Sequence, residues 1–276
     1  MTLLLGCDFS SSPSRRKPIV VALGCAAGDV VTLTGLEAFT TLDDWGRWLA
    51  TTPHWIGGFD FPFGLPRELV DTLGWPRQWP ALIAHYASLS RHDIRTAFAA
   101  FCAARPVGGK FAHRATDGPA GSSPSMKWVN PPVAYMLQAG VPRLIAAGAC
   151  LPGLHRPAAS ESDRIALEAY PGLLARELIG RRSYKNDAVA LQTPERTAAR
   201  VALLEALGQG ATRLGLRLAL TTGQRATLVA DASGDRLDAV LCLVQAAWCA
   251  ARADSAGPGY GLPVGIDPLE GWIATA

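Results

Sequence analysis

The sequence has little lysine, few charged residues and no long hydrophobic run. Charged residues make up 18% of its 276 positions and hydrophobic residues 49%, a balance typical of a globular chain with a buried core. No stretch reaches the roughly 18 apolar residues that a membrane helix needs, and no basic segment precedes the leucines at residues 3–5. We therefore expect a cytoplasmic protein without a membrane partner.

Runs of like charge and the common nucleotide-binding motifs are also absent. The formal net charge is +3 and no block of five like charges occurs, so the sequence has no strongly basic segment typical of nucleic-acid binding. The chain has no G-x-x-x-x-G-K-[ST] motif and no strand-linked G-x-G-x-x-G, which argues against P-loop and Rossmann sites. A nucleic acid or nucleotide partner is compatible with this composition but is not required by it.

Neither the cysteines nor the histidines have the spacing of a metal site. The six cysteines form no C-x-x-C pair, and the five histidines match no H-E-x-x-H pattern. The cysteines stand in hydrophobic surroundings, which predicts buried, reduced thiols. We assign the histidines no role.

Short apolar runs alternate with amphipathic segments, which predicts an α/β protein. Thr40 or Thr41 can cap the first helix, and Pro194 opens a clear amphipathic one. The predicted strands cover residues 3–9, 19–25, 30–33, 55–60 and 164–169. The predicted helices cover residues 42–49, 81–89, 94–104, a stretch from 194 onward, and 235–251.

The chain reads as a single domain over residues 1–276, with a helical and loop insertion at about 66–160. Pro66 suits the first turn of a helix. Residues 105–132 are rich in Gly, Ser and Pro and contain several charged side chains, as expected of a long loop near a functional site. Residues 214–232 receive no assignment.

Acidic residues end or interrupt the apolar segments at Asp8, Asp60, Glu168 and the pair Asp235 and Asp238. An ionised group in such a place is costly unless something compensates it. Clustered carboxylates suit a hard cation, and we expect these five residues to bind Mg²⁺ or Mn²⁺. For Asp235 a helix-capping role is at least as good an explanation, because it opens a helix.

Five short segments resemble the DUF429 family, described as predicted nucleases of ribonuclease H-like fold. The likeness spans most of the chain but is weak between about residues 74 and 159. The segments are residues 6–10 (GCDFS), 58–64 (GFDFPFG), 168–171 (EAYP), 183–185 (SYK) and 235–239 (DRLDA).

The resemblance implies a ribonuclease H-like fold, with a five-stranded mixed central sheet flanked by helices. It also implies that Asp8, Asp60, Glu168 and Asp238 lie nearest the active centre and act in catalysis. Lys185 joins them as a candidate that balances the negative charge or contacts a phosphate, with a solvated loop lysine as the equal alternative.

Three further residues are candidates for substrate binding. Ser10 follows Asp8 closely and can present its hydroxyl to a phosphate, although a Ser-rich turn needs no such purpose. Lys110 and Arg114 lie in the long loop, where Arg114 can instead form an exposed ion pair with Asp117 that contributes little.

Three functions are consistent with these residues. The first is a metal-dependent hydrolase of phosphodiester bonds, a nuclease or phosphodiesterase in which carboxylate-bound Mg²⁺ or Mn²⁺ activates a water. The second is a binding or regulatory protein on the same scaffold, which the modest net charge favours because nuclease grooves generally carry positive charge. The third is an ATP-dependent phosphotransferase. The sequence leaves the oligomeric state open.

Overall fold

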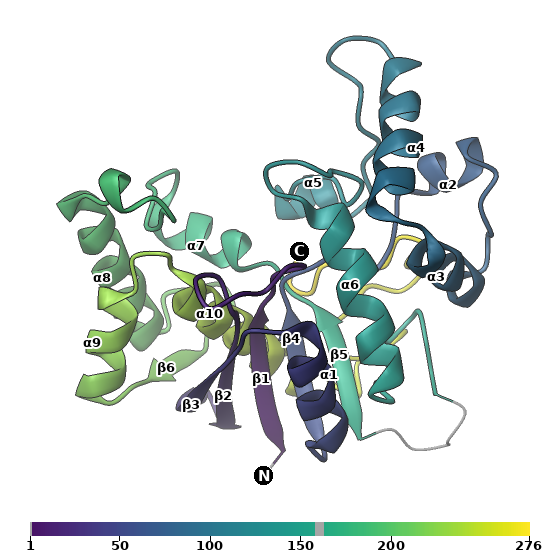
Figure 1. Cartoon of the computed structure of the whole chain (residues 1–276). Coiled ribbons are helices and arrows are strands. Elements are labelled where there is room, and N and C mark those ends of the chain that lie inside the picture. The colour runs from purple at the N-terminus through teal and green to yellow at the C-terminus, as the bar shows by residue number, and fades with distance from the viewer. Residues whose placement is uncertain (1, 158–162) are drawn as a thin grey trace.

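The computed structural model describes residues 2–157 and 163–276, which form a mixed sheet between two layers of helices (Figure 1). The strands are β1 (Leu3–Asp8), β2 (Ile19–Ala27), β3 (Val30–Phe39), β4 (Trp55–Phe59), β5 (Arg164–Glu168) and β6 (Arg217–Ala219). The helices are α1 (Leu42–Thr51), α2 (Arg67–Thr72), α3 (Trp79–Ser88), α4 (Arg91–Ala103), α5 (Asp117–Ala120), α6 (Val133–Ala146), α7 (Pro171–Ile179), the 3-10 turn η1 (Val189–Leu191), α8 (Pro194–Gln209), α9 (Thr222–Ala230) and α10 (Asp235–Ala250).

The strand order across the sheet is β5-β4-β1-β2-β3-β6. Strands β1, β2 and β3 form an antiparallel meander, whereas β4 pairs in parallel with both β1 and β5. The carboxyl ends of β1, β4 and β5 therefore meet at one edge of the sheet. Ligand sites of open α/β sheets commonly lie outside such an edge.

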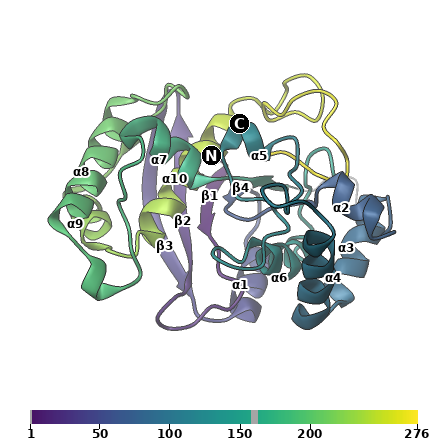
Figure 2. The ribbon, with the colours of Figure 1, turned by 90° about the horizontal axis from the view of Figure 1, so that it is seen from above.

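Each face of the sheet has its own hydrophobic core. Leu5 belongs to the core shared with α1, α3, α4 and α6, and its neighbour Leu4 belongs to the core shared with α7, α8, α9 and α10. The alternation follows from the strand, in which successive side chains point to opposite faces. Figure 2 shows the two groups of helices on the two sides of the sheet.

Helix α10 lies unusually close to the middle of the sheet because two strand glycines face it. A Cβ atom at Gly6 would lie 2.0 Å from the Ala239 carbonyl oxygen, and one at Gly58 would lie 2.6 Å from the Cys242 carbonyl oxygen. Real Cβ contacts of that length do not occur, so only glycine lets the helix backbone approach here. This contact sets the position of the first turn of α10.

The observed elements confirm an α/β protein with a mixed sheet flanked by helices. Thr41 caps α1, as its sequence suggests, by accepting a hydrogen bond from the Asp44 N–H. The sheet has six strands among the described residues, one more than the resemblance implies. The extra strand β6 and helix α9 account for residues 214–232, where a three-residue strand is too short to show a period.

Strand β3 and helices α6 and α7 also differ from the predicted set. Strand β3 continues to Phe39, well past residue 33, and pairs with β2 on both sides of a register shift between Leu23 and Gly24. Helix α6 occupies the segment after the long loop even though it contains Pro142. In the part of the chain that the structure describes, no helix has both the length and the hydropathy to cross a membrane.

Candidate functional site

Asp8 and Asp60 lie side by side at the carboxyl ends of β1 and β4. Cys7 is the register partner of Phe59, and the Asp60 N–H donates to the Cys7 carbonyl oxygen at 2.9 Å. Each aspartate follows by two residues a glycine that faces α10, so both side chains leave the sheet on the α10 face. The two carboxylates are therefore brought together by the parallel pairing of their strands.

The first turn of α10 adds Asp235 and Asp238 to this edge. Asp238 is fully buried, and its two oxygens accept from the Tyr184 hydroxyl and the Lys185 ammonium group. Lys17 donates to Asp235 at 2.9 Å. We call the group of Asp8, Asp60, Asp235 and Asp238 the carboxylate edge.

The carboxylate edge carries more negative than positive charge. Its four carboxylates face two ammonium groups, those of Lys17 and Lys185. Burial disfavours the charge of Lys185, but Asp238, Tyr184 and Asp8 together outweigh burial and raise the pKa of Lys185 well above its ordinary value. Lys185 is therefore cationic at neutral pH. When all four carboxylates are ionised, they exceed the two lysines by two negative charges, and Lys17 also pairs with Asp187.

Asp8 and Asp60 carry the unbalanced charge. No described residue donates a hydrogen bond to either carboxylate, and both side chains are partly buried. Burial, followed by repulsion from Asp238, raises the pKa of Asp60 from 3.8 to about 7, although Lys185 acts in the opposite direction. The same two causes raise the pKa of Asp8 well above its ordinary value. Both groups would gain from a bound cation.

Glu168 has a different environment at the end of the neighbouring strand β5. Its register partner is Phe59, so Glu168 leaves the sheet on the face opposite to Asp60. Its oxygens accept from the Phe63 N–H at 2.9 Å and from Arg114 at 2.6 and 2.8 Å. The structure thus brings together four of the five expected metal ligands and holds Glu168 apart from them, already hydrogen-bonded.

Arg114 is buried, and the expectation of an exposed loop pair with Asp117 is wrong. Its guanidinium donates five hydrogen bonds: two to Asp117, two to Glu168 and one to the Glu270 carbonyl oxygen. Five is the full donor capacity of the group. Arg114 therefore has no donor left for a substrate. We call Arg114, Asp117 and Glu168 with the Glu270 carbonyl the Arg114 clasp.

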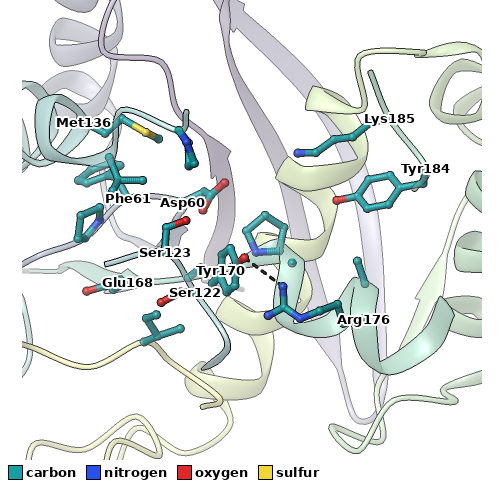
Figure 3. Close-up of a pocket in the computed structure, with 18 of the residues that line it drawn as sticks. Asp60, Phe61, Ser122, Ser123, Met136, Glu168, Tyr170, Arg176, Tyr184 and Lys185 are labelled. Carbon is teal, nitrogen blue, oxygen red and sulfur yellow. Dashed lines mark hydrogen bonds between the residues drawn. The ribbon is translucent and has the colours of Figure 1, made fainter. Parts of the chain in front are cut away.

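A pocket of about 420 Å³ opens between the carboxylate edge and the Arg114 clasp. Figure 3 shows Asp60 pointing toward Lys185, whereas Glu168 points away from it. The apolar wall comes from the segment after β4, from the start of α6 and from α7. Its lining includes Phe61, Pro131, Val133, Met136, Pro171 and Ile179.

Two of the expected substrate-binding residues lie outside this pocket. Lys110 is exposed in the long loop and does not line it. Ser10 does not line it either, and its hydroxyl accepts from the Ser12 N–H at 3.3 Å. Lys185 does line it.

Two residues that position the site carry no recognisable sequence signal. Arg200 of α8 is buried and donates to the Tyr184 carbonyl oxygen at 2.7 Å, which fixes the loop that carries Tyr184 and Lys185. A Cβ at Gly234 would lie 2.7 Å from Cβ of Lys185, so the glycine makes room for the lysine stem. A buried arginine has no local sequence signal, because its partners are distant in the chain.

The donor set fits a hard divalent cation held by few protein ligands. Within the described ranges, no group of three or more His, Cys, Asp and Glu side chains is arranged to hold a metal by itself. Mg²⁺ does not need such a cage, because it usually keeps several waters and takes one or two carboxylates plus a substrate phosphate. Asp8 and Asp60 supply that pair.

Comparison of the chain with protein-family models, with curated proteins and with solved structures found no match. The function is therefore argued from the geometry of the site.

Proposed function

We propose that the protein is a divalent-metal-dependent phosphodiesterase on a ribonuclease H-like scaffold. The observation that carries the proposal is the pair Asp8 and Asp60, which end neighbouring parallel strands and whose carboxylates accept no hydrogen bond from the described residues. Asp60 lines the pocket together with Lys185, whose ammonium group pairs with Asp238. Protein carboxylates that serve only structure are normally hydrogen-bonded, as Glu168 is.

The charge balance supports a divalent ion at this place. The carboxylate edge has two negative charges more than its lysines neutralise, and one Mg²⁺ or Mn²⁺ supplies that difference. A phosphate that approaches the same ion brings new negative charge, and Lys185, Arg176 and Arg182 are cations that line the pocket.

The reaction is hydrolysis of a phosphate diester. The oxygen of water forms a bond to phosphorus, the ester P–O bond breaks, and the leaving oxygen takes a proton, which gives an alcohol and a phosphate monoester. The bound cation would activate the water and stabilise the leaving oxygen. Asp8 and Asp60 would hold the cation, and Tyr184 and Lys185 would keep Asp238 ionised and in place.

The test compares aspartates at opposite edges of the sheet. Hydrolysis of bis(p-nitrophenyl) phosphate and of a thymidine dinucleotide is measured with Mg²⁺ or Mn²⁺ for wild type, Asp8→Asn and Asp60→Asn. Asp29→Asn is the control, because Asp29 lies in the β2–β3 turn at the far edge, exposed and paired with Arg217. We expect each site variant to lose at least about a hundredfold in kcat/KM and the control to keep its activity.

Calorimetric titration of Mn²⁺ separates binding from chemistry. Binding by wild type and Asp29→Asn, with loss in Asp8→Asn, is the expected result. Equal hydrolysis by Asp8→Asn and wild type would contradict the proposal. Absence of Mn²⁺ binding from all of the proteins would favour a non-catalytic binding protein instead.

A further inference from the structure

The pocket beside Asp60 has the size and the walls of a site for one small planar group. Its volume of about 420 Å³ falls within the roughly 300–1,000 Å³ of small-molecule sites. Most of its wall is apolar, and its polar side chains lie both at the carboxylate edge and at the Arg114 clasp.

Flat and polarisable side chains shape the pocket. Tyr170 contributes an aromatic ring and Met136 contributes a thioether from α6 (Figure 3). Phe61 lines the pocket from the core, where its ring packs against Phe9 and Phe63. The Arg176 guanidinium lies over the Tyr170 ring at 5.1 Å and donates to the Tyr170 hydroxyl at 3.1 Å. Aromatic rings and guanidinium planes are the surfaces on which unpaired nucleobases stack.

The Arg114 clasp closes the pocket on the side away from Lys185. All five donors of Arg114 are used within the protein, and the oxygens of Glu168 accept three hydrogen bonds. These charged groups therefore form a satisfied wall and do not compete for a ligand. The other cations of the lining are Arg176, Arg182 and Lys185, of which Lys185 also pairs with Asp238.

We infer that this pocket receives one unpaired nucleobase of the substrate and so places the adjoining phosphodiester against Asp60 and Lys185. The inference rests on the proposed function and adds its substrate class: single-stranded ends and small nucleoside diesters. Paired bases are stacked inside a duplex and can reach such a pocket only after being extruded from it. The net charge of +3 agrees, since binding along a duplex backbone depends on many lysine and arginine contacts.

The experiment is a double-change cycle: one change removes the bases from the substrate, and the other fills the pocket of the protein. The substrates are a thymidine dinucleotide and the same diester with both bases replaced by hydrogen. The variant is Met136→Trp, which fills the pocket from α6. The control is Val107→Trp, which adds the same ring at a loop position that is 93% exposed and does not line the pocket.

In the wild type we expect removal of the bases to lower kcat/KM at least about tenfold, the size of one stacking interaction. In Met136→Trp the same removal should change kcat/KM less than about threefold, because the pocket is already filled. Val107→Trp should behave as wild type. Arg176→Lys leaves the pocket open without its planar cation, and it should reduce the effect of base removal while circular dichroism shows an intact fold.

Single-stranded and blunt duplex oligonucleotides of one sequence give the second comparison. We expect the single strand to be hydrolysed at least about tenfold faster, because its terminal base is free to enter the pocket. Equal rates on the two substrates would overturn the inference.

The remaining outcomes separate this inference from the proposed function. If Asp60→Asn loses activity while wild type hydrolyses both diesters equally, the nucleobase inference is wrong and the proposed phosphodiesterase function stands. If the wild type hydrolyses neither diester, calorimetry with thymidine monophosphate decides. Binding by wild type that weakens at least about tenfold in Met136→Trp supports the pocket assignment, whereas equal or absent binding overturns it.

Discussion

The carboxylate edge and the Arg114 clasp lie at the ends of neighbouring parallel strands, yet they treat their acidic side chains in opposite ways. In the clasp, one buried guanidinium uses every donor, and Glu168 accepts three hydrogen bonds. At the edge, Asp8 and Asp60 accept none from the described residues, and their pKa values are raised by burial and by Asp238.

This difference indicates that the Arg114 clasp stabilises the fold, whereas the carboxylate edge is arranged for a ligand. A buried ion pair with all its hydrogen bonds made ties segments together, here the long loop, β5 and the C-terminal segment. Adjacent carboxylates without donors cost folding free energy and persist where a ligand compensates them. Removing a charged group should therefore lower the free energy of unfolding at the clasp and raise it at the carboxylate edge.

The largest expected effect on stability is at the clasp. Arg114→Met leaves Glu168 and Asp117 buried without their cation, which should lower the free energy of unfolding by about 3–5 kcal/mol. Urea unfolding followed by circular dichroism measures it. Arg217→Met is the matched control, because it breaks the exposed pair with Asp29 and should leave the midpoint unchanged. Equal effects of the two substitutions would remove the distinction between clasp and surface pair.

A smaller effect is expected where α10 contacts the sheet. Gly6→Ala places a methyl group against the α10 backbone and should cost about 1–3 kcal/mol by overpacking. It should also weaken Mn²⁺ binding, since it displaces the first turn that carries Asp238. Gly35→Ala is the control on β3, where a new Cβ meets only Leu23 at 3.7 Å. Unchanged stability in Gly6→Ala would show that α10 is not held at this distance.

The last expected effect is the pH dependence of the carboxylate edge. The pKa of Asp60 is about 7 in the folded protein against 3.8 ordinarily, so the folded state binds a proton that the unfolded chain lacks between those pH values. Stability is therefore highest below about pH 4 with respect to this group, and it falls as the pH rises to about 7. In Asp60→Asn this decline should be smaller, and Tm at pH 8 should exceed that of wild type.

Thermal melts at pH 5 and pH 8, with and without MgCl₂, measure this effect. Mg²⁺ should raise Tm of the wild type more at pH 8, where Asp60 is ionised, than at pH 5. Asp43→Asn, which removes an exposed carboxylate of α1, should keep the wild-type pattern. A Tm of Asp60→Asn below that of wild type at pH 8 would show that Asp60 stabilises the fold.

Much of the fold and part of the site follow from local sequence patterns. Apolar runs located β1, β2, β4 and β5, because a strand buried on both faces needs continuous hydrophobicity. The Gly-x-Asp spacing at residues 6–8 and 58–60 also repeats a structural unit: a glycine that admits α10, followed by an aspartate on the same face. Strand β6 lacked a signal, since three residues cannot show a period.

Local patterns along the chain are enough to predict that carboxylates end the central strands and that Asp235 and Asp238 open a long buried helix. Which of these carboxylates lie together depends on how the strands pair. Glu168 aligns with Phe59 rather than with Asp60, and a shift of one residue in the β4–β5 register would bring its carboxylate to the α10 face. Register depends on the packing of both sheet faces, so the partners of an acidic side chain are fixed by residues far away in the chain.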